Sequence, residues 1–296
     1  MKYLVTGING FVAPYLKELL VKEGHEVKGV SRKDIELSDH KGVADLIRNV
    51  NFDGVFHLAA QAHSLNSAKM PYKTFCDTAL STINIVDAIE NKSHKTKLVY
   101  VASGEVYGAR QDHITEDKPY APKNPYSTSK VISELYVLDR TKNDKINAVI
   151  ARPYGQLGTR RPANFVITSD AKQIAKILEG KQEPVIKVGN LSAERTFMDV
   201  KDTVKGYSLL MDKAQSGEAY NLGGDKLRSI GDYLNMMLEM YDLKHVKIET
   251  NPNLLRANDT NRQWPNSDKI RKLGWKQTIS IEKTLEEIIE HWRKQV

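Results

Sequence analysis

The sequence predicts an α/β protein with a doubly wound parallel sheet and a smaller C-terminal α/β lobe. Three observations predict this fold class. Short apolar segments alternate with helical patterns through the first half of the chain, a glycine-rich turn follows the first apolar segment, and the second half is less regular. Because right-handed crossovers bring the carboxyl ends of parallel strands to one edge of the sheet, we expect ligands to bind there.

The first half of the chain supplies the strands of this sheet. Strands are expected at 2–6, 26–31, 54–59, 97–102 and 146–151. Helices are expected near 11–23, 40–50, 72–91 and 126–141. The glycine, polar and small residues at the predicted strand ends are Gly7, Ser31, Ala59, Ser103 and Arg152. They are the first candidates for a binding site.

The second half is expected to form the lobe and to close over a cleft. Its helices are expected within 161–181 and at 200–213, 229–241, 266–273 and 280–294, with strands at 185–188, 194–198 and 218–224. Ser280 is a good N-cap for the last helix. We expect residues 1–155, joined by 196–222, to form the large domain. Residues 156–195 and 223–296 are expected to form the lobe.

Composition excludes several classes of protein. The chain has 296 residues and a net charge of +7, but its lysines and arginines are scattered, so bound phosphates explain the charge better than nucleic acid does. No apolar run reaches the roughly 18–20 residues of a membrane span. The N-terminus lacks a signal-peptide pattern, Cys76 is the single cysteine, and no metal-ligand spacing occurs. We expect a cytoplasmic enzyme with no metal and no nucleic-acid or membrane partner.

A glycine loop follows the first predicted strand and precedes the first predicted helix. It reads Thr6-Gly7-Ile8-Asn9-Gly10-Phe11-Val12-Ala13. Gly7 permits the tight turn, and Gly10 lets the backbone approach a pyrophosphate at the helix N-terminus. The alternative is a glycine-rich turn without a ligand. Placed between a strand and a helix, the loop favours a dinucleotide site.

A YxxxK pair, Tyr126 and Lys130, opens the helix predicted at 126–141. Asn124 is a good N-cap and Pro125 a good first helical residue. Residues four apart share one helix face, so the ammonium is expected to favour the phenolate and to lower the tyrosine pKa. Such a pair is suited to moving a proton on or off a sugar or alcohol oxygen.

Together these motifs resemble the extended short-chain dehydrogenase/reductase family that acts on nucleotide-sugars, whose sheet is of the Rossmann type. The matching segments keep the family's order. They are the glycine loop, Phe56-His57-Leu58-Ala59-Ala60, Ser103-Gly104-Glu105-Val106-Tyr107-Gly108, the YxxxK pair and Arg152-Pro153. His57 itself is expected to be a buried, hydrogen-bonded residue of a core strand rather than a catalyst.

The resemblance implies a role for each catalytic candidate. Ser103 would hydrogen-bond the substrate carbonyl and Tyr126, and Tyr126 would deliver the proton. Lys130 would hold the nicotinamide ribose, and Glu105 would lie beside the reacting sugar. The residues implied to bind the cofactor are Gly7, Asn9, Gly10, Phe11, Val12, Ser31, Arg32, Leu58, Ala59, Ala60, Tyr126, Lys130 and Arg152.

Downstream segments are most similar to the GDP-sugar branches of this family. Arg195 and Arg256 are the candidates for the diphosphate, helped by Asn164 and the backbone near Val166; for each arginine the alternative is a surface salt bridge. Glu105, with Ser64 and His63, would line the sugar pocket. The chain departs from the family pattern at Thr78, Gly155, Ala257, Arg262 and Trp264. These departures leave the identity of the sugar open.

The end of the second predicted strand bears on the choice of cofactor. An acid that would bind the ribose 2′-hydroxyl is missing at Ser31, and Arg32 could pair with a 2′-phosphate. We therefore expect NADP(H). In the alternative, the Asp34 carboxylate binds the ribose 2′-hydroxyl and the cofactor is NAD(H).

The function implied is NADPH-dependent reduction of a GDP-4-keto-6-deoxy sugar in deoxysugar nucleotide biosynthesis, giving rhamnose or 6-deoxytalose. A very short link between the second and third strands (Arg32 to Asp34) is taken to favour this reductase. The alternatives are a GDP-mannose 4,6-dehydratase with Glu105 as base, an epimerase or epimerase-reductase, and a non-catalytic NADP(H) sensor. Such sensors usually lack the tyrosine or lysine. Relatives also imply a homodimer through the helices at 72–91 and 126–141.

Overall fold

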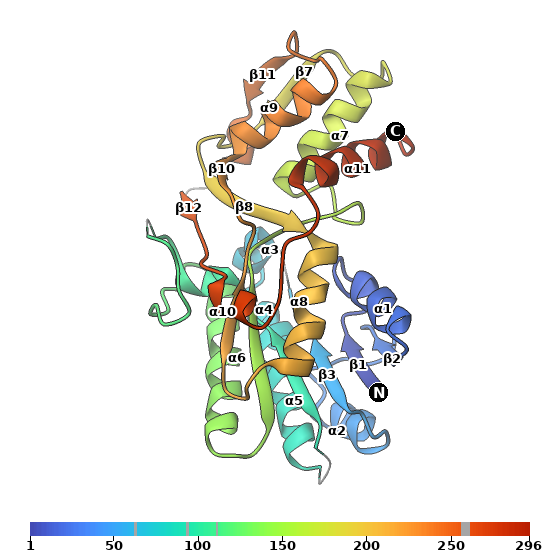
Figure 1. The fold of residues 1–296 in the computed structure, drawn as a ribbon, viewed down its shortest axis with the longest axis vertical. Helices are drawn as coiled ribbons and strands as arrows, with labels where there is room; N and C mark the ends of the chain where they lie inside the picture. Colours follow the sequence, from blue (N-terminus) through green and yellow to red (C-terminus); the bar gives the residue numbers. More distant parts are fainter. Residues whose placement is uncertain (62–63, 93–94, 111, 256–260) are drawn as a thin grey trace.

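Six parallel strands form the central sheet (Figure 1). In spatial order they are β2 (Glu26–Val30), β1 (Lys2–Thr6), β3 (Gly54–His57), β4 (Lys97–Val101), β5 (Asn147–Pro153) and β9 (Ala219–Leu222). Every neighbouring pair runs parallel. The computed structural model describes residues 1–61, 64–92, 95–110, 112–255 and 261–296. The predicted parallel sheet is therefore confirmed.

Helices cover both faces of the sheet. Successive residues of a strand point to opposite faces, and Tyr3, Leu4 and Val5 are all buried, so both faces of β1 are apolar. The face of Tyr3 and Val5 packs against α1 (Ala13–Lys22) and α8 (Val200–Lys213). The face of Leu4 packs against α2 (His40–Arg48), α5 (Ser81–Glu90) and α6 (Pro125–Lys142). A doubly wound sheet results.

The order of the strands places a crevice beside β1. The chain leaves β1 for β2 on one side and returns to β3 on the other, so the crossovers diverge between β1 and β3. Gly7 and Ala59 meet at that point. Gly7 has a φ of +73°, and a Cβ on it would lie 3.0 Å from the Ala59 Cα. A side chain at position 7 would therefore be strained in two ways.

The smaller lobe stands above the carboxyl ends of the strands (Figure 1). Its core joins three helices, α7 (Val166–Leu178), α9 (Ile230–Met240) and α11 (Ile281–Arg293). A parallel pair lies beside them, β7 (Val185–Val188) and β11 (Lys247–Thr250). A second small sheet lies between the lobe and the main sheet, with β6 (Gly155–Leu157), β8 (Glu194–Asp199), β10 (Leu227–Ser229) and β12 (Arg262–Gln263).

Most predicted elements are present, with ends that shift by a few residues. The helix predicted at 72–91 is a run of α4 (Pro71–Phe75), a π-helical turn (Cys76–Leu80) and α5. The helix predicted at 266–273 is the short α10 (Asp268–Lys272), and the structure adds α3 (Ser64–Lys69). The predicted domain boundaries stay a prediction.

One prediction about connectivity is wrong. The link between β2 and β3 is not a three-residue turn, because residues 31–53 join the two strands and contain α2. The length of this link therefore does not favour a reductase over a dehydratase.

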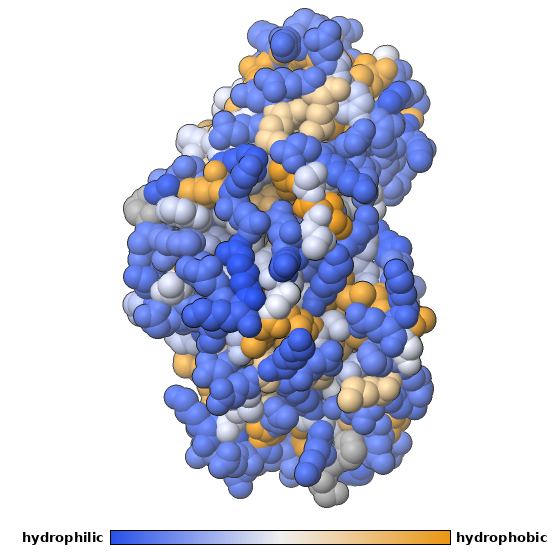
Figure 2. All heavy atoms as spheres, in the orientation of Figure 1, coloured by the Kyte–Doolittle hydropathy of each residue, from blue (hydrophilic) through white to orange (hydrophobic). Residues whose placement is uncertain are grey.

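The outer surface is mixed in character. Hydrophilic side chains cover most of the face seen in Figure 2, and apolar side chains appear there in small separate groups. None of the described helices combines the length and the apolar character that crossing a bilayer requires.

Candidate functional site

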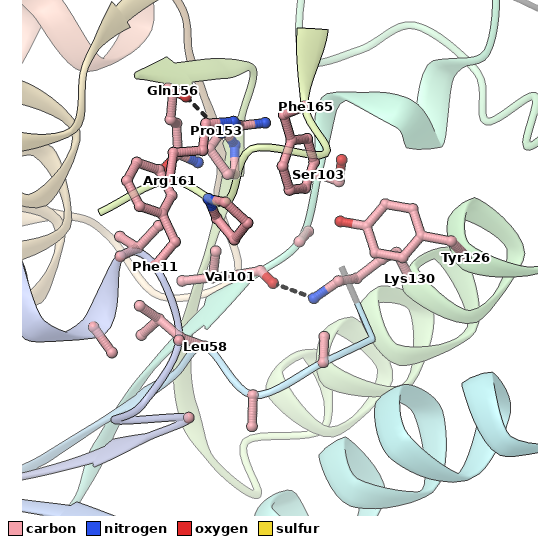
Figure 3. Close-up of a pocket in the computed structure, with 18 of the residues that line it drawn as sticks. Phe11, Leu58, Val101, Ser103, Tyr126, Lys130, Pro153, Gln156, Arg161 and Phe165 are labelled. Carbon is pink, nitrogen blue, oxygen red and sulfur yellow. Dashed lines mark hydrogen bonds between the residues drawn. The ribbon is translucent and has the colours of Figure 1, made fainter. Parts of the chain in front are cut away.

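A cavity of about 680 Å³ lies where the strand ends meet the lobe. Its walls come from the glycine loop, the ends of β2, β3 and β4, the start of α6, the segment 153–167 and β8. Figure 3 shows side chains of the glycine loop, the ends of β3 and β4, α6 and the segment 153–165 facing one another across the cavity. The volume is in the range of small-molecule and cofactor sites.

The glycine loop is shaped to receive an anion. The Gly10 amide donates to the Gly7 carbonyl oxygen (2.8 Å), which closes the turn. Helix α1 begins after Val12 with no side-chain cap, so the amides of its first turn remain available to a ligand. The loop residues at the cavity are Gly7, Asn9, Gly10, Phe11 and Val12. This arrangement suits a pyrophosphate at the helix N-terminus.

Buried hydrogen bonds fix the neighbouring end of β3. The Thr6 hydroxyl oxygen accepts from the Leu58 and Ala59 amides, both at 3.1 Å. His57 bridges Thr6 through Nδ1 (2.8 Å) and Thr82 through Nε2 (3.1 Å). Burial lowers the His57 pKa to about 3, so the ring is neutral. His57 is thus a buried structural residue, as predicted. Leu58, Ala59 and Ala60 line the cavity.

Ser103 and Glu105 are both held by helix N-caps: Ser103 is itself an N-cap, and Glu105 is bound by the N-cap residue of α6. Ser103 follows β4 and caps the 3₁₀ turn Gly104–Tyr107, its hydroxyl accepting from the Glu105 amide (3.2 Å). The Glu105 carboxylate accepts from the Asn124 side chain (3.2 Å), and Asn124 is the N-cap of α6. Ser103 therefore caps a turn and lines the cavity at once. Glu105 lines the same wall.

Tyr126 and Lys130 lie one turn apart on α6, at the floor of the cavity. The Tyr126 hydroxyl points toward Ser103, and the Lys130 ammonium donates to the Val101 carbonyl oxygen at 2.6 Å (Figure 3). Both side chains are buried. Burial lowers the Lys130 pKa to about 7, and the charge of Glu134 acts in the opposite direction. Lys130 is thus held at the cavity as a buried, readily deprotonated amine.

The expected effect of Lys130 on Tyr126 is wrong. Burial raises the Tyr126 pKa above its usual value and the Glu105 charge raises it further, while a hydrogen bond with Ser103 and the charge of Arg161 lower it. Desolvation therefore outweighs the favourable partners, and the cation among those partners is Arg161. At neutral pH Tyr126 keeps its proton, which is the form that can donate.

Arg152, predicted to contact the cofactor, points into the protein instead. Its guanidinium is 3% exposed and pairs with Glu134, donating from Nε to Oε1 at 2.7 Å. It also donates to the hydroxyls of Tyr107 and Tyr120 and to the Glu116 carbonyl oxygen. It is not among the residues at the cavity. Arg152 therefore ties β5 to α6, the helix that carries Tyr126 and Lys130.

The far end of the cavity carries Ser31 and Arg32, as predicted, and also Glu36. The Asp34 carboxylate accepts from the Ser31 amide (2.8 Å) and hydroxyl (2.7 Å) and is not at the cavity. The Arg32 guanidinium pairs with the buried carboxylate of Asp77 (2.7 Å). Sequence reasoning missed Glu36 and Asp77, because neither belongs to a motif.

The structure places only some of the predicted substrate-binding residues at the cavity. Val166 and Arg195 line the cavity, and Arg195 donates to the Glu194 carbonyl oxygen at 2.9 Å. Asn164 is exposed and is not among the lining residues. Ser64 begins α3, but its side chain, together with His63, Arg256 and Ala257, lies outside the described residues.

Gly155 is one of the positions at which this chain departs from the family pattern, and the structure leaves no space there for a side chain. A Cβ on Gly155 would lie 2.4 Å from the Phe197 ring. Because that Cβ would also lie 2.5 Å from the Thr196 backbone oxygen, a polar side chain could occupy this position only if the backbone of β8 moved as well.

Sequence reasoning also missed Gln156, Arg161 and Phe165, which line the cavity. They belong to the segment between β6 and α7, where no periodic pattern marks which side chains face inward. An arginine pair, Arg160-Arg161, was the one available signal, and it does not say which member is buried.

Comparisons with known proteins agree with this geometry. A family model described as GDP-mannose 4,6 dehydratase matches residues 33–288. GDP-6-deoxy-D-mannose reductase of Pseudomonas aeruginosa is 27% identical over 302 residues, covering 100% of this chain and 98% of that protein. GDP-mannose 4,6 dehydratase 2 of Caenorhabditis elegans is 23% identical, covering 97% of this chain and 87% of that protein.

Solved structures are similar over the whole length. The structure of RMD from Pseudomonas aeruginosa complexed with NADPH has a TM-score of 0.91 and 26% identity, covering 100% of this chain and 99% of that one. UDP-glucose 4-epimerase of Thermus thermophilus in complex with NAD has a TM-score of 0.88 and 23% identity, with 100% of both chains covered; it shares the fold. This chain therefore belongs to the GDP-mannose 4,6-dehydratase family, within the short-chain dehydrogenase/reductase type.

Proposed function

We propose that this protein is an NADPH-dependent reductase of a GDP-4-keto-6-deoxy sugar. One observation carries the proposal. Ser103, Tyr126 and Lys130 meet a dinucleotide-shaped glycine loop at one cavity, in a chain similar over its full length to GDP-6-deoxy-D-mannose reductase. Similarity to RMD complexed with NADPH supports a nicotinamide cofactor. Location in the cytoplasm stays a prediction.

The chain's own residues account for the proton and for the developing charge. A bound nicotinamide would supply the hydride for carbon 4. As the carbonyl oxygen gains negative charge, Ser103 donates a hydrogen bond to it and Tyr126 transfers its phenolic proton to it. The carbonyl thereby becomes a hydroxyl, with one hydride and one proton added. The charge of Arg161 favours the phenolate that remains, and Lys130, held at Val101 one turn from Tyr126, would bind the nicotinamide ribose.

Groups on the lobe side of the cavity would bind the nucleotide-sugar. The Arg195 guanidinium suits a diphosphate, and Val166 begins α7 at the same wall. Ser64, Asn164 and Arg256 stay predictions for this role.

A 4,6-dehydratase is the second candidate, and one observation favours it. Glu105 lines the cavity, is held by Asn124 and lies close enough to Tyr126 to raise its pKa, so a base stands beside the proposed sugar site. Several relatives are also named GDP-mannose 4,6-dehydratases. The third alternative, an epimerase, would use Glu105 or His63.

Consumption of cofactor separates these candidates. The purified protein is mixed with NADPH and freshly made GDP-4-keto-6-deoxymannose, and absorbance of NADPH is followed. Stoichiometric oxidation supports the reductase. Conversion of GDP-mannose to a keto sugar without net NADPH oxidation would support the dehydratase instead.

Arg32→Asp is expected to weaken NADPH binding roughly 10- to 100-fold more than NADH binding. The guanidinium lines the cavity, and Asp77 would keep Lys73 as a partner (3.1 Å) if Arg32 turned to a 2′-phosphate. Fluorescence titration with each cofactor measures the two affinities. Arg48→Asp, the same charge change at an exposed side chain of α2, is the control. Equal loss of both cofactors in Arg32→Asp would contradict the NADP(H) assignment.

We propose a homodimer through α6 and the neighbouring α4–α5 run. These helices pack together and expose five large apolar side chains, Met70, Tyr72, Leu80, Ile132 and Leu135. Leu135, 50% exposed, points to solvent from the helix that carries the catalytic tyrosine.

Leu135→Lys is expected to convert the dimer to a monomer, because a charge would be buried at the interface. Light scattering after gel filtration measures the mass. Val21→Lys, at a residue 53% exposed on α1, is the control and should stay dimeric. A monomeric wild type would overturn the dimer.

A further inference from the structure

Asp77 is a buried carboxylate at the far end of the cavity, beside Arg32. Its side chain is 3% exposed and lines the cavity. It belongs to the π-helical turn Cys76–Leu80, which joins α4 to α5. Turns of this kind inside a helical run occur frequently at functional sites. Because a buried carboxylate is destabilising unless cations pair with it, the partners of Asp77 decide what it can do.

Two cations share this carboxylate. Arg32 Nη2 lies 2.7 Å from Asp77 Oδ2, and Lys73 Nζ lies 3.1 Å from Asp77 Oδ1. Arg32 also lies near a second acid, because its Nε is 3.8 Å from a carboxylate oxygen of Glu36. Within this group of four side chains the positive and negative charges therefore balance. The group offers an entering anion no net positive charge.

This balance bears on the choice between NADPH and NADH. The two cofactors differ by one phosphate on the adenosine ribose, and Arg32 is the residue predicted to bind it. An arginine fork binds a phosphate through N–H donors that point toward it, but Arg32 Nη2 already donates to Asp77. If Arg32 turned to a phosphate, Lys73 would remain on Asp77, so the buried carboxylate would keep a cation. Arg32 can therefore exchange one anion for the other, but it loses an ion pair when it does so.

We propose that Asp77 sets how strongly the protein prefers NADPH over NADH, by competing with the 2′-phosphate for the Arg32 guanidinium. The inference rests on the proposed function, which brings NADPH to this cavity. Asp77 limits the preference for NADPH, because Arg32 gives up its ion pair with Asp77 to bind the phosphate. Binding of NADH, which lacks that phosphate, leaves the ion pair intact. Asp77 thus acts through Arg32 and is a positioning residue, not a catalytic one.

Asp77→Asn tests this role, because it removes the charge and keeps the size of the side chain. Fluorescence titration of the purified protein with NADPH and with NADH measures the two dissociation constants. Asp77→Asn is expected to bind NADPH about 5- to 20-fold more tightly than the wild type does, and NADH within about two-fold. Unchanged or weaker binding of NADPH by Asp77→Asn would overturn the inference.

Glu90→Gln is the matched control. Glu90 ends α5 in the same helical run, accepts from Arg140 Nε at 2.8 Å and is not among the residues at the cavity. The substitution removes one carboxylate from an arginine, as Asp77→Asn does. It is expected to leave both dissociation constants within about two-fold of the wild type.

A second background separates competition for Arg32 from direct repulsion between Asp77 and the phosphate. In Arg32→Gln protein no guanidinium remains to be released, so adding Asp77→Asn is expected to change NADPH binding by less than about two-fold. An equal gain in NADPH affinity with and without Arg32 would overturn the competition. These outcomes leave the proposed function intact, whereas wild-type protein that binds neither cofactor would overturn both proposals.

Lys73→Met gives a second test if Asp77→Asn does not fold. Lys73 is half exposed and is not among the residues at the cavity. Its loss would leave Asp77 more dependent on Arg32, so Lys73→Met is expected to weaken NADPH binding about 3- to 10-fold and to leave NADH binding within about two-fold. Unchanged binding of NADPH by Lys73→Met would overturn the inference.

Discussion

Tyr126→Phe is expected to lower turnover by roughly 10²–10⁴-fold while leaving NADPH affinity within about two-fold. The substitution removes one hydroxyl and keeps the buried ring on α6. Because burial and Glu105 keep Tyr126 protonated, its hydroxyl is the donor ready for the new alkoxide. Steady-state kinetics and fluorescence titration of NADPH measure the two quantities.

A matched tyrosine controls for loss of a hydroxyl. Tyr220 is buried on β9, away from the cavity, so Tyr220→Phe should turn over like the wild type. Turnover of Tyr126→Phe close to that of the wild type would end the proton-donor role. It would favour a water-mediated route or a protein that is not an oxidoreductase.

Arg152→Met is expected to lower the free energy of unfolding by about 3–5 kcal/mol. The Glu134 side chain is fully buried beside Arg152, and the substitution would leave its carboxylate without its cation. Tyr107 and Tyr120 would lose a donor as well. Urea unfolding measures the change.

The double variant Arg152→Met/Glu134→Leu separates loss of a partner from loss of packing. Because it removes both charges, it is expected to be more stable than Arg152→Met alone. A stable Arg152→Met with weakened NADPH binding would contradict the internal role. That result would instead support the contact between Arg152 and the cofactor that the sequence predicts.

Local patterns in the sequence were enough to predict the parallel sheet. Strands such as β1 and β4 are short apolar runs, whereas β2 contains Glu26 and Lys28, and helical patterns with an apolar face lie between the strands. Asn124 and Ser280 do cap their helices, since capping depends on residues within one turn. The link between β2 and β3 was misjudged although the helix predicted at 40–50 is present as α2, because only the first residues after β2 were counted as the link.

The site was predictable where a motif holds its residues close in sequence. The glycine loop and the YxxxK pair both reach the cavity. Arg161 and Arg152 show where prediction of the site from local sequence fails. Whether an arginine enters a cavity or pairs with a buried Glu134 is decided by packing between distant segments, which no local spacing records. The pKa of Tyr126 depends in the same way on burial, which the YxxxK spacing does not contain.

Transfer of a labelled hydride tests the central claim most directly. The protein is incubated with GDP-4-keto-6-deoxymannose and NADPH that carries deuterium on its transferable position, and the product is examined by NMR. The account predicts one deuterium at carbon 4 of the sugar for each NADPH oxidised, with the configuration at carbon 4 deciding between rhamnose and 6-deoxytalose. A sugar without deuterium at carbon 4, formed while NADPH is not consumed, would contradict the reductase.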